Sequence, residues 1–168
     1  QSLRELVAAK VFVAGASGLL GSQVVPYLRG CGHDVTAHGR KAGDVTGDLS
    51  DLPQTFAQLD AAKPAVVINL VALTDVDMCE RAPQQAYLGN VRVVENIARW
   101  IAERGAGCHL VQLSTDQIYD GPGNHREADV TISNHYGLSK YAGELAASRV
   151  SHTILRTNFV GRSVHPTR

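Results

Sequence analysis

The chain alternates short apolar runs with stretches of helical periodicity, and this alternation limits the folds open to it. The apolar runs span 10–14, 34–38, 45–49, 65–70, 109–113 and 152–156. Short runs of this kind indicate buried parallel strands. Helical patterns lie between them, over 19–29, 51–61, 83–104 and 136–149. The sequence therefore predicts an α/β fold, a Rossmann-like doubly wound parallel sheet with helices on both faces.

Local signals mark several helix ends. Ser50 or Asp51 can cap the helix over 51–61, and Gly105 ends the long helix over 83–104. Pro26 falls inside the first helical pattern, where it should kink or shorten the helix. The segment 120–134 is rich in Gly, Pro and Asn and reads as a loop.

Composition excludes several classes of function. The 168 residues carry no formal net charge and their basic residues are scattered, so we expect no nucleic-acid partner and no anionic membrane surface. No apolar stretch reaches the ~20 residues that span a bilayer, and no signal peptide opens the chain, so we expect a cytoplasmic protein. The first residue is not Met and the last residues form no obvious ending, which suggests a fragment.

The metal-ligating residue types show no pattern typical of a metal site. Cys31, Cys79 and Cys108 have no metal-ligand spacing and lie in or beside apolar segments, so we expect buried free thiols in a reducing compartment. The seven histidines include no pair with ligand spacing. No metal is predicted.

A glycine-rich turn follows the first apolar run. In Gly15-Ala16-Ser17-Gly18-Leu19-Leu20-Gly21, the first glycine permits a tight turn and the second lets a pyrophosphate approach the backbone. The third allows close packing of the helix, whose N-terminus would face the phosphates with free N–H groups. The spacing is G-x-x-G-x-x-G rather than the general G-x-G-x-x-G, but the strand–turn–helix context predicts dinucleotide binding over a plain turn.

The second apolar run ends at His38-Gly39-Arg40, where the adenosine ribose is read. No acidic residue stands there to take the ribose hydroxyls, whereas Arg40 is placed to meet a 2′-phosphate and Lys41 can assist. NADP(H) is therefore preferred, with NAD(H) as the alternative. Asp48-Leu49 would meet the adenine ring, unless Asp48 only caps a helix.

Tyr136 and Lys140 are four residues apart and thus share one helix face. A cation beside the phenol would lower its pKa and make it a useful acid. Ser114-Thr115-Asp116 ends the fifth apolar run upstream. The pair alone is a weak signal, because a solvated helix face also explains it.

Together these motifs resemble the extended short-chain dehydrogenase/reductase family and, more narrowly, its dTDP-4-dehydrorhamnose reductase branch. The resemblance runs from residue 11 to about residue 162. Family-level motifs are GASGLLG (15–21), Asp48-Leu49, NLVA (69–72), Asn90, YGLSK (136–140) and LRTNFVG (155–161). TDVDMCE (74–80) and STDQIYDG (114–121) resemble the rhamnose-pathway reductases more than the sugar epimerases.

The resemblance implies a role for each matching residue. Tyr136 would protonate a carbonyl oxygen, Lys140 would lower the tyrosine pKa and hold the nicotinamide ribose, and Thr115 would hydrogen-bond the carbonyl. Asn90 would help to hold the catalytic helix and a relay water. The implied cofactor-binding residues are Gly15, Ser17, Gly18, Leu19, Leu20, Gly21, Arg40, Asp48, Leu49, Asn69, Val71, Ala72, Tyr136 and Lys140. Asp116, Tyr119 and Asn158 are candidates for substrate contact, although each has an ordinary structural explanation, and Arg156 is expected to be structural.

The implied activity is NADPH-dependent reduction of a nucleotide-activated 4-keto-6-deoxy sugar, with a nucleotide-sugar substrate and room for a homodimer. Residues 1–168 would form one NAD(P)-binding domain, with the start of a substrate-binding region at about 157–168 and most of that region absent. Two alternatives stay open. One is a nucleotide-sugar epimerase or dehydratase, and the other is a non-catalytic NADP-binding protein like the regulatory subunit of methionine adenosyltransferase.

Overall fold

The computed structural model describes residues 8–158, which form one six-stranded parallel sheet in the order β3-β2-β1-β4-β5-β6. Its strands are β1 (Lys10–Ala14), β2 (Asp34–Gly39), β3 (Val45–Thr46), β4 (Val66–Asn69), β5 (His109–Thr115) and β6 (His152–Thr157). The predicted doubly wound sheet is confirmed, and the expected strand over 45–49 is shorter than predicted. Residues 159–168, where most of the expected substrate-binding region falls, lie outside the described residues.

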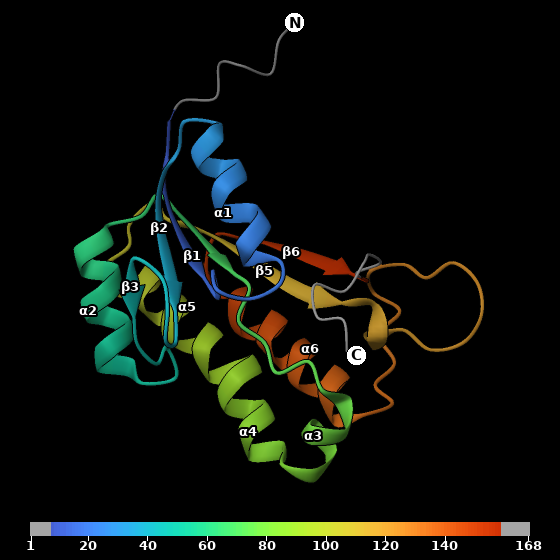
Figure 1. Ribbon diagram of the computed structural model, residues 1–168. Coiled ribbons are helices and arrows are strands. Elements are labelled where there is room, and N and C mark those ends of the chain that lie inside the picture. Colours follow the sequence, from blue (N-terminus) through green and yellow to red (C-terminus); the bar gives the residue numbers. More distant parts are fainter. Residues whose placement is uncertain (1–7, 159–168) are drawn as a thin grey trace, which may run out of the picture.

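Helices cover both faces of the sheet because successive strand residues point to opposite sides. Val11 and Val13 pack with α1 (Gly21–Gly30), whereas Phe12 packs in a second cluster on the opposite face. That face is covered by α2 (Leu52–Ala62), α5 (Val93–Glu103) and α6 (His135–Ala147), as Figure 1 shows. The helix α1 runs to Gly30 with Pro26 inside it, so the proline does not shorten it.

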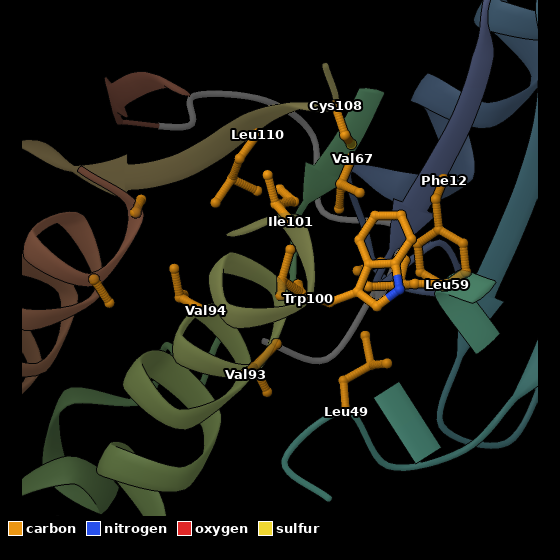
Figure 2. Close-up of a cluster of buried hydrophobic side chains, with 14 residues drawn as sticks. Phe12, Leu49, Leu59, Val67, Val93, Val94, Trp100, Ile101, Cys108 and Leu110 are labelled. Carbon is orange, nitrogen blue, oxygen red and sulfur yellow. The ribbon is translucent and has the colours of Figure 1, made fainter. Parts of the chain in front are cut away.

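The larger apolar cluster anchors β1, from which the glycine turn departs. In Figure 2 the Trp100 ring of α5 lies beside Phe12 of β1 and Leu59 of α2. The indole nitrogen is satisfied by Asp60, 2.8 Å away. Truncating a fully buried ring such as Phe12 to Ala typically costs about 3–5 kcal/mol, so this cluster holds the turn firmly in place.

The long helix predicted over 83–104 is observed over residues 83–103, with one irregular turn inside it. It contains α4 (Pro83–Tyr87), a π-helical segment (Leu88–Arg92) and then α5. A further short helix, α3 (Val76–Arg81), was not predicted. Asp75 caps it by accepting from the Met78 N–H at 2.8 Å, so an N-cap signal was present in the sequence.

The expectation of three buried thiols is correct for two of them. Cys79 and Cys108 are buried, but Cys31 is exposed. Cys31 follows the last residue of α1 and is the C-cap of that helix, in a turn at the surface. No helix in residues 8–158 is both long and apolar enough to cross a bilayer.

Candidate active site

The glycine turn fits tightly between β1 and the end of β4. Gly15 has φ +82°, and a Cβ there would lie 3.0 Å from the backbone of Leu70 and Val71. A Cβ on Gly21 would lie 2.5 Å from the Ala16 Cα. The backbone can adopt this turn only with glycine at both positions. No side chain caps α1. Its Ser22 and Gln23 N–H groups donate to the Gly18 and Leu20 carbonyls, both at 3.0 Å, so an anion would be met by the N–H groups earlier in the turn and by the positive end of the helix dipole.

The turn lies at the point where the strand order reverses. Strand β1 pairs with β2 on one side and with β4 on the other. Ligands of open α/β sheets bind in the crevice at the carboxyl ends of the strands at such a point. Val71 and Ala72, directly after β4, are partly buried there, whereas Leu19 is exposed and Leu20 partly buried.

The end of β2 brings together the residues expected at the adenosine end. Arg40 is exposed directly after the strand. A Cβ on Gly39 would lie 2.8 Å from the Ser17 Oγ, so Ser17 of the glycine turn packs against this strand end. The Asp48 carboxylate accepts from the Ser50 N–H and hydroxyl at 2.9 and 2.7 Å, and these bonds lower its pKa, with a smaller effect from Arg40.

Leu49 and Asp51, which follow Asp48 in the chain, have structural roles in the core and at the start of α2. Leu49 is buried in the core. The cap of α2 is Asp51, which accepts from the Gln54 N–H at 2.9 Å. The alternative reading of Asp48 as the helix cap is therefore wrong.

A buried polar chain forms the floor of the site. The Asn69 amide donates to Gln112 at 2.8 Å and accepts from the Val71 N–H at 3.2 Å. Gln112 in turn donates to the Leu113 carbonyl at 2.9 Å, and Lys140 donates to the same carbonyl at 2.7 Å. Gln112 thus connects β4 to α6, through the Leu113 carbonyl that it shares with Lys140. The sequence analysis missed it, because a single glutamine in an apolar strand carries no signal of its partners.

Tyr136 and Lys140 lie in α6, whose first turn is capped by Asn134. Both side chains are buried, and burial governs their acidity. Burial raises the pKa of Tyr136, and hydrogen bonding with the Thr115 hydroxyl opposes this shift. Burial also lowers the pKa of Lys140 to about 8, opposed by the charge of Glu144.

The predicted lowering of the Tyr136 pKa by Lys140 is not found. Lys140 is absent from the groups that shift the phenol, and its ammonium bonds to the Leu113 carbonyl. The spacing placed both residues on one helix, but it did not reveal how deeply α6 packs against β5. Desolvation of the phenol therefore dominates.

Thr115 is brought to the same place from β5. Its hydroxyl accepts from the Gln117 N–H at 3.2 Å, at the start of the 3₁₀ helix Asp116–Ile118. The Tyr136 ring packs in a buried cluster with Cys79 and Ala86. The phenol and the Thr115 hydroxyl therefore share one partly desolvated site.

Asn90 connects this site to two other segments. Its side-chain carbonyl oxygen accepts from the Leu73 N–H at 2.7 Å. Its side-chain NH₂ donates to the Leu73 carbonyl at 3.0 Å and to the Ser139 hydroxyl at 2.9 Å. Ser139 donates to the Tyr136 carbonyl at 2.8 Å. Asn90 lies in the π-helical segment, and a Cβ on Gly143 of α6 would lie 2.5 Å from the main-chain carbonyl oxygen of Asn90. Ser139, not singled out from the sequence, completes the link to α6.

The three candidates for substrate contact are not gathered around Tyr136 to the same degree. Asp116 follows Thr115 directly, and its charge raises the pKa of Tyr136. The Tyr119 hydroxyl accepts from Arg156 at 2.7 Å. Asn158 is exposed and directly follows β6. Among residues 8–158, no three His, Cys, Asp or Glu side chains are grouped to hold a metal ion.

Comparison with known proteins gives one consistent result. The family model described as the RmlD substrate binding domain matches residues 9–164. A dTDP-4-dehydrorhamnose reductase from Streptomyces griseus is 39% identical over 141 residues, which are 82% of this chain and 44% of that protein. The chain spans about half the length of the curated relatives it matches.

Solved structures agree with this result. The dTDP-4-dehydrorhamnose reductase of Bacillus anthracis, in complex with NADP, has a TM-score of 0.79 at 27% identity, covering 90% of this chain and 54% of that one. A hypothetical dTDP-4-dehydrorhamnose reductase from Sulfolobus tokodaii has a TM-score of 0.80 at 35% identity, covering 88% of this chain and 55% of that one.

Proposed function

The chain belongs to the RmlD substrate binding domain family, and from this premise we propose that it carries the cofactor-binding and proton-donating part of an NADP(H)-dependent reductase. The proposed substrate is a nucleotide-activated 4-keto-6-deoxy sugar, in line with the names of its relatives. The observation that carries the proposal is that Tyr136 and Lys140 of α6 both lie against the carboxyl end of β5, the first at the Thr115 hydroxyl and the second at the Leu113 carbonyl. Strand β5 is two strands away from β1, where the glycine turn begins.

The residues present fit a dinucleotide. The backbone of the Gly15–Gly21 turn excludes side chains at two positions and precedes an uncapped helix, a combination suited to a pyrophosphate. Arg40 would pair with a 2′-phosphate, and Asn69, Val71 and Ala72 would line the cleft toward the nicotinamide. When bound, NADPH supplies the hydride that reduces the carbonyl carbon. NAD(H) stays the alternative cofactor.

The raised pKa of Tyr136 suits reduction. A phenol with this pKa keeps its proton at neutral pH, so Tyr136 is ready to donate it to the carbonyl oxygen as that oxygen gains negative charge. The Thr115 hydroxyl would hydrogen-bond the same oxygen. Lys140, positively charged at neutral pH and held by the Leu113 carbonyl, would bind the ribose.

The test is NADPH oxidation by the full-length protein with a dTDP-4-keto-6-deoxy sugar, followed by absorbance. Tyr136→Phe should lower kcat by about 10²–10⁴-fold while leaving NADPH binding intact. Tyr141→Phe, on the same helix, is the matched control and should retain activity. Tight NADPH binding without oxidation of any keto sugar would instead support the non-catalytic binder, and isomerisation without net oxidation would support the epimerase.

Three further features of the proposed protein stay predictions. These are one NAD(P)-binding domain over residues 1–168 that leads into a substrate-binding region, a cytoplasmic location and a homodimer. The nucleotide-sugar partner rests on the family and on the names of the relatives.

A further inference from the structure

One ion pair differs from all others in residues 8–158. Arg156 of β6 and Glu144 of α6 meet at 2.6 Å, with side chains only 15% and 3% exposed. The guanidinium Nε also lies 3.0 and 3.2 Å from the two carboxylate oxygens. The other five ion pairs have side chains at least 38% exposed. Exposed pairs contribute little, whereas a buried pair fixes geometry because breaking it strands a charge.

The same guanidinium holds the loop that follows β5. Its Nη1 donates to the Tyr119 hydroxyl and to the Glu127 carbonyl, both at 2.7 Å. The guanidinium carbon also lies 5.3 Å from the centre of the Tyr119 ring, which stacks on His125. One side chain thus contacts both ends of the segment 119–127. Figure 1 shows this loop projecting beyond the ends of β5 and β6.

The Glu144 carboxylate connects Arg156, and the loop that Arg156 holds, to the proposed catalytic residues. Glu144 accepts a hydrogen bond from Ser114, the residue before Thr115, and it lies one helical turn after Lys140. Ser114 and Arg156 are directly opposite in the β5–β6 register. Arg156 and Glu144 therefore join the 119–127 loop, β5, β6 and α6 at a point one residue away from Thr115.

We propose that Arg156 is a positioning residue that fixes the 119–127 loop on the substrate side of the site, in register with Thr115 and Tyr136, through its joint contacts with Glu144, Tyr119 and Glu127. The proposal rests on the proposed reductase function. Arginine is needed because its planar fork serves a carboxylate, a hydroxyl and a carbonyl at once, whereas lysine presents one compact charge. A residue that positions the loop should affect the sugar more than the cofactor, whereas a residue that only stabilises the fold should affect both.

Arg156→Lys in the full-length protein is the test, with Arg104→Lys as the matched control. Arg104 also pairs with a carboxylate, that of Asp60, and lies over an aromatic ring, that of Phe56, but it sits beyond the last residue of α5. Arg156→Lys should raise the sugar KM and lower kcat, together by about 10- to 100-fold in kcat/KM, and leave the NADPH Kd within about twofold. It should also speed amide exchange in 117–131, and Arg104→Lys should do neither.

Two results would overturn the proposal. One is unchanged kcat and KM in Arg156→Lys despite faster exchange in the loop. The other is a loss of activity matched by an equal loss of NADPH binding or of folded protein, because that would make Arg156 a general structural residue. If Arg156→Lys does not fold, Glu144→Gln, which keeps the side-chain shape, should show the same split between sugar and cofactor.

Failure of the proposed reductase function can be told apart from failure of the positioning role. If the reductase function is wrong, the wild-type protein itself oxidises no NADPH with the sugar. The role of Arg156 is then decided by direct binding of the nucleotide sugar to wild type and Arg156→Lys, together with the exchange data. Equal sugar affinity in the two proteins would refute the positioning role.

Discussion

The Lys140 ammonium lies 2.7 Å from the main-chain carbonyl oxygen of Leu113, so β5 holds the buried cation of α6. Burial lowers the pKa of this lysine from 10.5 to about 8. A shift of this size corresponds to about 3 kcal/mol of destabilisation when the lysine is charged in the folded state. The residue proposed to serve the reaction is therefore unfavourable for folding.

Replacing Lys140 by Met should stabilise the fold, by up to about 3 kcal/mol at neutral pH, and abolish turnover. Leu113 keeps a donor in Gln112, so no carbonyl is left unpaired. Between pH 8 and 10.5 the unfolded chain holds a proton on Lys140 that the folded chain has lost, so this lysine makes wild-type stability rise with pH. Above pH 9 the buried Cys108 thiol, whose pKa is raised to about 11, opposes the rise. Urea unfolding between about pH 7 and 9 should show the rise in wild type and in Lys10→Met, but not in Lys140→Met. A less stable Lys140→Met at neutral pH would show that the Leu113 contact outweighs desolvation.

Asn90→Ala should lower both stability and kcat. Its amide makes three hydrogen bonds, to the backbone of Leu73 and to Ser139, and their loss should cost about 1–3 kcal/mol. Asn96 is a matched control, because it is also buried and bonds two carbonyls, of Leu49 and Ser50. Asn96→Ala should lose similar stability in thermal unfolding but keep kcat. Equal kcat in the two variants would remove Asn90 from the proposed machinery.

Gly21→Ala should weaken NADPH binding at least tenfold, a change of about 1.4 kcal/mol, because its Cβ would push α1 away from the glycine turn. Gly30→Ala is the control on the same helix, since a Cβ there meets nothing within 4 Å. Isothermal titration with NADPH and NAD(H) measures both variants. Unchanged affinity in Gly21→Ala would show that this turn does not receive the pyrophosphate.

Arg40→Ala should weaken NADP binding by about 10- to 100-fold, the usual size of a lost charged hydrogen bond, and change NAD binding little. Lys41→Ala, at the next exposed position, should have a smaller effect. Titration of each variant with NADP and with NAD gives the ratio of the two dissociation constants. The interpretation of Arg40 is wrong if the two affinities fall together.

Local features of this fold could be predicted from sequence, whereas features made by distant packing could not. The Gly15–Gly21 turn could be predicted because its need for glycine comes from a tight turn and from the close approach of neighbouring backbone. The links from Asn90 to Leu73 and Ser139 span 17 and 49 residues, so no local pattern encodes them. The same holds for Gln112, whose partner Asn69 is 43 residues away on β4, and for the acidity of Tyr136, which depends on how α6 is buried against β5.

The π-helical segment 88–92 has a consequence for how such a site can arise. A π turn holds one residue more than an α turn. Deleting a single residue there would turn the segment into a regular α-helical turn and let α4 and α5 run on as the one regular helix that the periodicity predicts, with the faces of α4 and α5 kept. The bonds from Asn90 to Leu73 and Ser139, which start within the wide turn, are the contacts that the deletion would disturb. In genetic terms, this hold on the catalytic helix is gained or lost with one in-frame codon.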